Sequence, residues 1–190
     1  MQTPRGVAVL VGSLRKASYS RLMTLALAKM AAPALSFDLI EIGDLPLYNE
    51  DLEASGTPQT WTTFRAQIRS CQAVGFVTPE YNRSVPAALK NALDVGSRPY
   101  GQSVWSGKPG AVISVSPGAI GGFGANHHLR QSLVFLNVPA MQQPEAYIGA
   151  AASLLNDAGD IVNDDTSTFL EGFLKAFSIW IDMLGAPTAG

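Results

Sequence analysis

The chain has 190 residues, of which 47% are hydrophobic and 15% charged, and its formal net charge is −2. A chain of this length can bury a full core as a single domain spanning residues 1–190, and its small net charge gives no indication of a nucleic-acid partner. Because no run of about 18 apolar residues and no signal-like leader is present, we expect a cytoplasmic protein without membrane insertion.

The first half of the chain alternates strand and helix patterns. Residues 7–11 form a continuous, β-branched apolar run that indicates a buried strand, and Ser18 or Ser20 can cap a following helix that ends at Pro33. The pattern then predicts a second strand at 37–42, a long loop at 43–60, a helix at 61–70 and a third buried strand at 73–78.

The second half continues the same alternation. A loop at 79–85 precedes a short helix at 86–95, a strand within 108–116, a glycine-rich loop at 117–124, a helix at 126–136 and a last short strand within 141–148. Residues 164–184 predict a long amphipathic helix that carries Phe169, Phe173, Phe177 and Trp180 on one face.

Strands that alternate with helices predict an α/β fold, with a parallel sheet between two layers of helices. Five strands favour a flavodoxin-like three-layer sandwich with strand order 2-1-3-4-5. In that order, a ligand lies at the carboxyl ends of strands one, three and four. The three unusual loops of this chain follow those three strands.

The loop after the first strand has the composition of a phosphate site. Ser13, Ser18 and Ser20 supply hydroxyl groups, Arg15 supplies a forked cation, and Gly12 permits a tight turn. The nucleoside-triphosphate, dinucleotide and serine-hydrolase glycine motifs are absent, and the loop has no cysteine for a phosphatase. An ordinary capped helix with a polar loop remains the alternative.

The other two loops suit a flat ligand. Pro79 fixes the direction of Glu80, Tyr81 and Asn82, which offer an aromatic wall and polar groups for a ring edge. Glu80 either accepts hydrogen bonds from neighbouring backbone or lines the ligand pocket. The third loop, at 116–122, combines the Ser116 hydroxyl with small residues that let the backbone approach a ligand.

The sequence contains no evident set of catalytic side chains. His127 and His128 are adjacent and would point in different directions on a helix, so they make a poor metal pair and we expect interface or surface roles. Cys71, the single cysteine, is expected to be a buried structural thiol. A site without catalytic residues or a metal suggests that a cofactor carries the chemistry.

Taken together, the three loops resemble the NADPH-dependent FMN reductase family, which includes bacterial quinone and chromate reductases and azoreductase-like proteins. The segments that carry the resemblance are Gly12-Ser13-Leu14-Arg15-Lys16-Ala17-Ser18, Pro79-Glu80-Tyr81-Asn82-Arg83-Ser84-Val85-Pro86, and Ser116-Pro117-Gly118 with Gly121-Gly122. The resemblance implies non-covalently bound FMN, with NADPH or NADH as electron donor.

The resemblance also implies roles for individual residues. The FMN phosphate would be held by Ser13, Arg15, Ser18, Tyr19 and Ser20; the isoalloxazine would be bordered by Pro79, Glu80, Tyr81 and Asn82, and closed on its other side by Ser116 and Gly118. A hydride would pass from the nicotinamide to flavin N5, and two electrons would then pass to a small acceptor such as a quinone, an azo compound or a metal oxyanion.

The family further implies a homodimer or homotetramer, and the apolar segment at 45–48 is a patch that a monomer would have to cover. Two other functions remain open. A flavodoxin-type electron carrier would bind FMN without NAD(P)H turnover, although such carriers usually need a strongly acidic docking surface. A redox-sensing or scaffold protein of the same fold would bind flavin without turnover.

Overall fold

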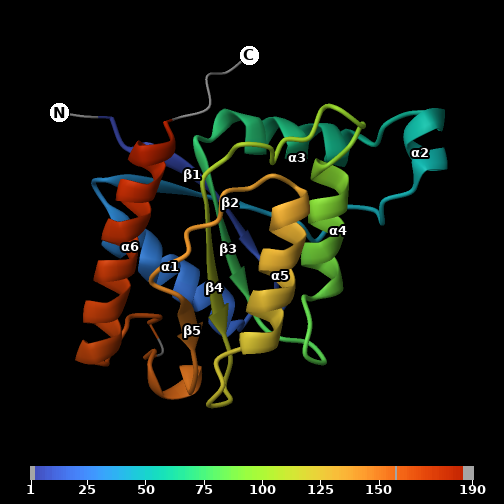
Figure 1. The fold of residues 1–190 in the computed structure, drawn as a ribbon. Helices are drawn as coiled ribbons and strands as arrows, with labels where there is room; N and C mark the ends of the chain where they lie inside the picture. The colour runs from blue at the N-terminus through green and yellow to red at the C-terminus, as the bar shows by residue number, and fades with distance from the viewer. Residues whose placement is uncertain (1–2, 157, 186–190) are drawn as a thin grey trace.

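Five parallel strands form one sheet in the order β2-β1-β3-β4-β5 (Figure 1). The computed structural model describes residues 3–156 and 158–185. The strands are β1 (Arg5–Val11), β2 (Leu35–Ile40), β3 (Ala73–Thr78), β4 (Gly110–Val115) and β5 (Ala146–Ile148). The expected α/β class and strand order are therefore confirmed.

Helices cover both faces of the sheet, as the three-layer prediction requires (Figure 1). The helices are α1 (Tyr19–Ala31), α2 (Glu50–Ser55), α3 (Gln59–Ser70), α4 (Ala87–Gly96), α5 (Phe123–Phe135) and α6 (Asp164–Leu184), with a short 3₁₀ turn at Ala151–Ser153. In Figure 1, α1 and α6 lie on one face of the sheet, and α3, α4 and α5 lie on the other.

Each face of the sheet has its own hydrophobic core because successive strand residues point to opposite sides. Val7 and Val9 of β1 pack with apolar residues of α1 and α6, among them Phe173 and Phe177. The intervening Ala8 and Leu10 pack in the second core, with residues of α3, α4 and α5. This two-sided burial explains why β1, β3 and β4 are almost continuously apolar in sequence.

Several predicted boundaries were wrong. The second strand occupies Leu35–Ile40 rather than 37–42, α3 begins at Gln59, and α5 begins at Phe123 rather than 126. The predicted loop at 43–60 contains α2, which begins where the Asn49 side chain accepts a hydrogen bond from the Asp51 N–H at 2.9 Å.

The loop after β2 is anchored by a buried side chain. The Asn91 amide of α4 accepts from the Tyr48 N–H and donates to the carbonyls of Leu45 and Pro46. Leu45 and Tyr48 therefore pack against the second core, and Tyr48 stacks on Trp61. The patch expected at 45–48 is thus partly covered by the chain itself, while Leu47 remains 75% exposed.

Candidate functional site

A cavity of about 140 Å³ lies where the loops after β1, β3 and β4 meet at the carboxyl end of the sheet. It is lined by Ser13, Arg15, Ser18, Tyr19, Ser20, Pro79, Glu80, Tyr81, Val115, Ser116 and Pro117. Nine of the eleven site residues expected from sequence are in this lining. Asn82 and Gly118 are not among the lining residues.

The three serines of the first loop are largely buried residues. Ser13, Ser18 and Ser20 are each less than one-tenth exposed. Ser18 caps α1, because its Oγ accepts a hydrogen bond from the Arg21 N–H at 3.3 Å, and its own proton remains available for donation. Within residues 3–156 and 158–185, the Ser13 and Ser20 hydroxyls have no hydrogen-bond partner. Accessible hydroxyls without a protein partner, on residues that are otherwise buried, are suited to an external acceptor.

Positive charge reaches the same cavity from two sources. Arg15 lines the cavity and forms no ion pair within the described parts of the chain. The first N–H groups of α1 lack partners inside the helix and carry its partial positive charge. Hydroxyls, a guanidinium and a helix N-terminus together form a donor set for a phosphomonoester. This donor set favours a phosphate site over an ordinary capped helix.

The second loop forms a tight two-residue turn. The backbones of Tyr81 and Ser84 exchange two hydrogen bonds, Tyr81 N to Ser84 O at 3.0 Å and Ser84 N to Tyr81 O at 2.9 Å. Asn82 and Arg83, at the tip, have φ values of 51° and 64°, as in a type I′ turn. The turn places Pro79, Glu80 and Tyr81 on the cavity and leaves Asn82 exposed at the tip.

Glu80 lines the cavity and also accepts a backbone hydrogen bond from α5. Its Oε2 accepts from the Ala125 N–H at 3.1 Å, and Arg83 contacts its Oε1 at 3.4 Å. The N-cap of α5 is Gly122, which has no side chain to cap the helix. Glu80 therefore caps α5 from another loop and fixes the second and third loops relative to each other.

The third loop approaches the cavity through Ser116. The Ser116 Oγ accepts a hydrogen bond from the Gly118 N–H at 3.1 Å, which turns the backbone after β4. Further along, the loop packs closely on the segment after β5, since a Cβ on Gly149 would lie 2.5 Å from the Ala119 carbonyl oxygen. The loop is held by backbone contacts that only glycine allows.

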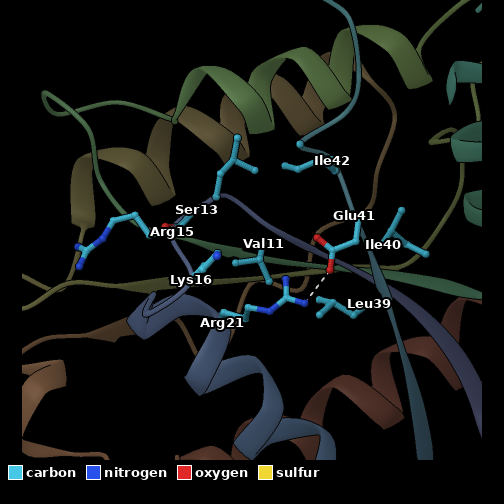
Figure 2. Close-up of a pocket in the computed structure, with 11 residues that line it drawn as sticks. Val11, Ser13, Arg15, Lys16, Arg21, Leu39, Ile40, Glu41 and Ile42 are labelled. Atoms are coloured by element: carbon cyan, nitrogen blue, oxygen red, sulfur yellow. Dashed lines mark hydrogen bonds and ion pairs between the residues drawn. The ribbon is translucent and has the colours of Figure 1, made fainter.

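A second cavity, of about 380 Å³, lies on the β2 side of the first loop (Figure 2). Its lining includes Ser13 and Arg15, which it shares with the first cavity, together with Lys16, Arg21 and Glu41. Arg21 of α1 donates to the Glu41 carboxylate at 2.7 Å. Sequence reasoning missed this cavity, because the predicted strand at 37–42 included Glu41, which in the structure follows the end of β2 at Ile40.

The remaining expected residues lie outside both cavities. Cys71 is buried, as predicted; burial and the adjacent Asp38 carboxylate raise the pKa of its thiol. His127 hydrogen-bonds Tyr147 Oη at 3.0 Å and His128 hydrogen-bonds Ser84 Oγ at 3.0 Å, so the two rings have different partners. Burial, followed by the neighbouring Glu145, raises the pKa of Tyr147 to about 12.

Residues 3–156 and 158–185 contain neither a metal-binding cluster nor a membrane-spanning helix. No three His, Cys, Asp or Glu side chains gather closely enough to hold a metal ion. No helix in these ranges has both the length and the apolar character needed to cross a membrane.

The chain is similar to known proteins over nearly its whole length. Residues 6–153 match the family model described as NADPH-dependent FMN reductase. A quinone reductase of Pseudomonas putida strain KT2440 is 64% identical over 177 residues, which cover 93% of this chain and 95% of that protein.

Two solved structures support the fold comparison. FerB, a flavoenzyme NAD(P)H:(acceptor) oxidoreductase from Paracoccus denitrificans, superposes with a TM-score of 0.91 at 44% identity, covering 95% of this chain and 99% of that chain. A flavodoxin mutant from Pseudomonas aeruginosa superposes with a TM-score of 0.55 at 19% identity, covering 93% and 99%. The second comparison shows the flavodoxin-like fold.

Proposed function

The chain belongs to the NADPH-dependent FMN reductase family, and from that premise we propose that it transfers two electrons from NADPH or NADH, through bound FMN, to a quinone. The observation that carries the proposal is the cavity at the carboxyl ends of β1, β3 and β4, which is lined by three largely buried serines and Arg15. The quinone acceptor is supported by the 64% identical relative, which is named a quinone reductase.

The residues present fit FMN. The Ser13 and Ser20 hydroxyls would donate to the phosphate oxygens, Ser18 would add its remaining proton, and Arg15 would balance the dianionic charge. Tyr19 would line the same part of the cavity. A volume of about 140 Å³ encloses the phosphate end of the cofactor rather than the whole of it.

The ring would then lie on the more open surface of the second and third loops. Pro79, Glu80 and Tyr81 would border one side of it, and Ser116 the other. Asn82 and Gly118 are proposed to contact the ring from positions outside the cavity lining. Tyr81 is 47% exposed, so its ring is accessible to a planar ligand.

The protein supplies binding and orientation rather than acid–base chemistry. Bound FMN would supply the hydride-accepting, two-electron chemistry. Glu80 keeps the second loop in register with α5 through its bond to Ala125. Arg15 and the α1 N-terminus would hold the phosphate, and in this way the chain would fix where the ring can lie.

Acceptor identity, assembly and location complete the proposal. Besides quinones, an azo compound or a metal oxyanion could take the electrons.

We propose a homodimer or homotetramer, which is supported by the strongly exposed Tyr100, Val134 and Phe135, at 91%, 79% and 89%. Sedimentation analysis tests the assembly. We propose a cytoplasmic location, where NADPH is regenerated, and cell fractionation tests it.

One experiment tests the central proposal. FMN-loaded protein is mixed anaerobically with NADPH, and bleaching of the flavin absorbance is expected, followed by its return when a quinone is added. Protein that binds FMN but is not bleached by NADPH or NADH would be a carrier or sensor and would overturn the proposal. Turnover of NADPH and quinone without a partner reductase separates the enzyme from a flavodoxin-type carrier.

A further inference from the structure

The second cavity has the size of a small-molecule site, and apart from Ser13 and Arg15 its lining residues are not among the proposed FMN contacts. Its volume of about 380 Å³ falls within the range of roughly 300–1,000 Å³ that is usual for ligand pockets. Its lining includes apolar residues of β1, β2 and the loops that follow them, namely Val11, Leu14, Leu39, Ile40 and Ile42. Leu14 and Leu39 are not buried, and their accessible apolar surface suits a flat heterocycle such as a purine.

The lining of this cavity also carries positive charge. Figure 2 shows Arg21 reaching from α1 and Lys16 pointing into the space between the first loop and β2, whereas Arg15 extends away from the Arg21–Glu41 pair. Lys16 forms no ion pair with any described residue. Arg21 donates from one nitrogen, Nη2, to the Glu41 carboxylate. The remaining guanidinium nitrogens of Arg21 can therefore donate to an anion.

Glu41 occupies a position that is informative in nucleotide-binding sheets. It is the first residue after β2, which ends at Ile40. In the dinucleotide-binding Rossmann fold, whose strand order differs from that of this chain, an acidic residue about 20 residues after the glycine motif accepts hydrogen bonds from an adenosine ribose, and a nearby arginine accommodates a 2′-phosphate. The Glu41–Arg21 pair offers both groups, 2.7 Å apart, at the corresponding strand end.

We propose that this cavity binds the 2′-phosphoadenosine half of NADPH, with Arg21 and Lys16 on the 2′-phosphate and the purine against Leu14 and Leu39. The inference rests on the proposed function, which it deepens by assigning donor preference to particular residues. Ser13 and Arg15 belong to both cavities, so one loop separates the donor's adenosine end from the FMN phosphate. A dinucleotide bound here crosses that loop toward the flavin ring.

The test uses FMN-loaded protein and a probe that cannot react, adenosine 2′,5′-bisphosphate, with adenosine 5′-phosphate as its partner lacking the 2′-phosphate. Calorimetry should show that Arg21→Ala weakens binding of the bisphosphate by about tenfold or more, the effect expected for losing one charge-assisted hydrogen bond. Steady-state kinetics should show a rise of similar size in the ratio of KM for NADPH to KM for NADH.

Glu41→Gln should change the affinity for the bisphosphate in the opposite direction to Arg21→Ala. Removing the carboxylate frees Arg21 and removes a negative charge beside the phosphate, so bisphosphate binding should tighten while NADH binding weakens. Lys29→Ala is the matched control, because Lys29 is another cation of α1 but pairs with Asp160, outside the cavity lining. It should leave both ligands unaffected.

Three outcomes would overturn the inference. Arg21→Ala could leave bisphosphate binding unchanged, or could weaken the two nucleotides equally, and either result removes the 2′-phosphate contact. Inorganic phosphate could bind the unmodified protein as tightly as the bisphosphate, which would make the cavity a simple anion site. Failure of NADPH to bleach the flavin would instead defeat the proposed function, while calorimetry would still report on the cavity.

Discussion

The Glu80 carboxylate accepts a hydrogen bond at 3.1 Å from the backbone N–H of Ala125, which lies 45 residues further along the chain. This bond supplies the first turn of α5 with the cap that Gly122 cannot provide. It also joins the loop after β3 to the loop after β4. The geometry of the candidate FMN site therefore depends on a contact between two loops that are distant in sequence.

Replacing Glu80 by alanine should destabilise the protein and loosen the site. Loss of a helix cap costs about 0.5–2 kcal/mol, so the free energy of unfolding of the FMN-free protein should fall by that amount in urea titrations. Glu171→Ala, at an exposed position of α6, is the control and should change it by less than about 0.5 kcal/mol. Equal effects of the two substitutions would show that Glu80 has no capping role.

Arg15 is expected to contribute more to FMN binding than any single hydroxyl. A hydrogen bond to a charged group contributes about 1.5–3 kcal/mol, so Arg15→Ala should raise the Kd for FMN at least tenfold. Arg15→Lys keeps the charge without the fork and should have an intermediate Kd. Quenching of FMN fluorescence measures both values. An unchanged Kd in the alanine variant would remove Arg15 from the site.

Gly149, which follows β5 and packs against the third loop, should not tolerate a side chain. A Cβ there would lie 2.5 Å from the Ala119 carbonyl oxygen, so the backbone must shift, at a cost of about 1–3 kcal/mol of unfolding free energy. Gly172→Ala is the contrasting variant, because a Cβ at this helical position meets nothing within 4 Å. It should stabilise the protein by about 0.5–1 kcal/mol. Thermal unfolding of both variants checks the opposite signs.

Cys71 should resist thiol reagents and give stability a pH dependence. Burial, followed by the hydrogen bond to Asp38, raises the pKa of its thiol above the ordinary 9.0. The folded state therefore favours the neutral thiol, and this contribution is complete below pH 9.0 and is lost as the pH rises through the folded pKa. Ellman's reagent should react slowly with native protein and quickly in urea.

Cys71→Ala provides the reference for the pH effect. Its free energy of unfolding should decline less steeply above pH 9.0 than that of the unmodified protein, since the other titrating groups are shared. Parallel declines in the two proteins would contradict the assignment.

The sequence was most informative where structure is set by local pattern. The continuous apolar run of β1 predicts a strand buried on both faces, and Ser18 predicts the start of α1, where its side chain forms the cap. The hydroxyls of Ser13 and Ser20 were placed correctly on one cavity because they flank a strand end and a helix start. The strand order brought their loop beside Pro79 and Ser116.

Features that depend on distant contacts could not be predicted in this way. The cap of α5 comes from Glu80 in another loop, so its true start at Phe123 had no local signal. The helix α2 lies in a segment held by Asn91 of α4. The second cavity exists because Arg21 and Glu41, from different elements, converge beside β1, and no spacing rule joins them.

The turn at Tyr81–Ser84 has a consequence for comparing this chain with its relatives. Because Asn82 has a φ of 51°, the backbone there favours asparagine, aspartate or glycine for steric reasons. Evolutionary conservation of asparagine at position 82 would therefore follow from the turn itself. A conserved residue at this position would report on chain reversal and would not by itself be evidence of a ligand contact.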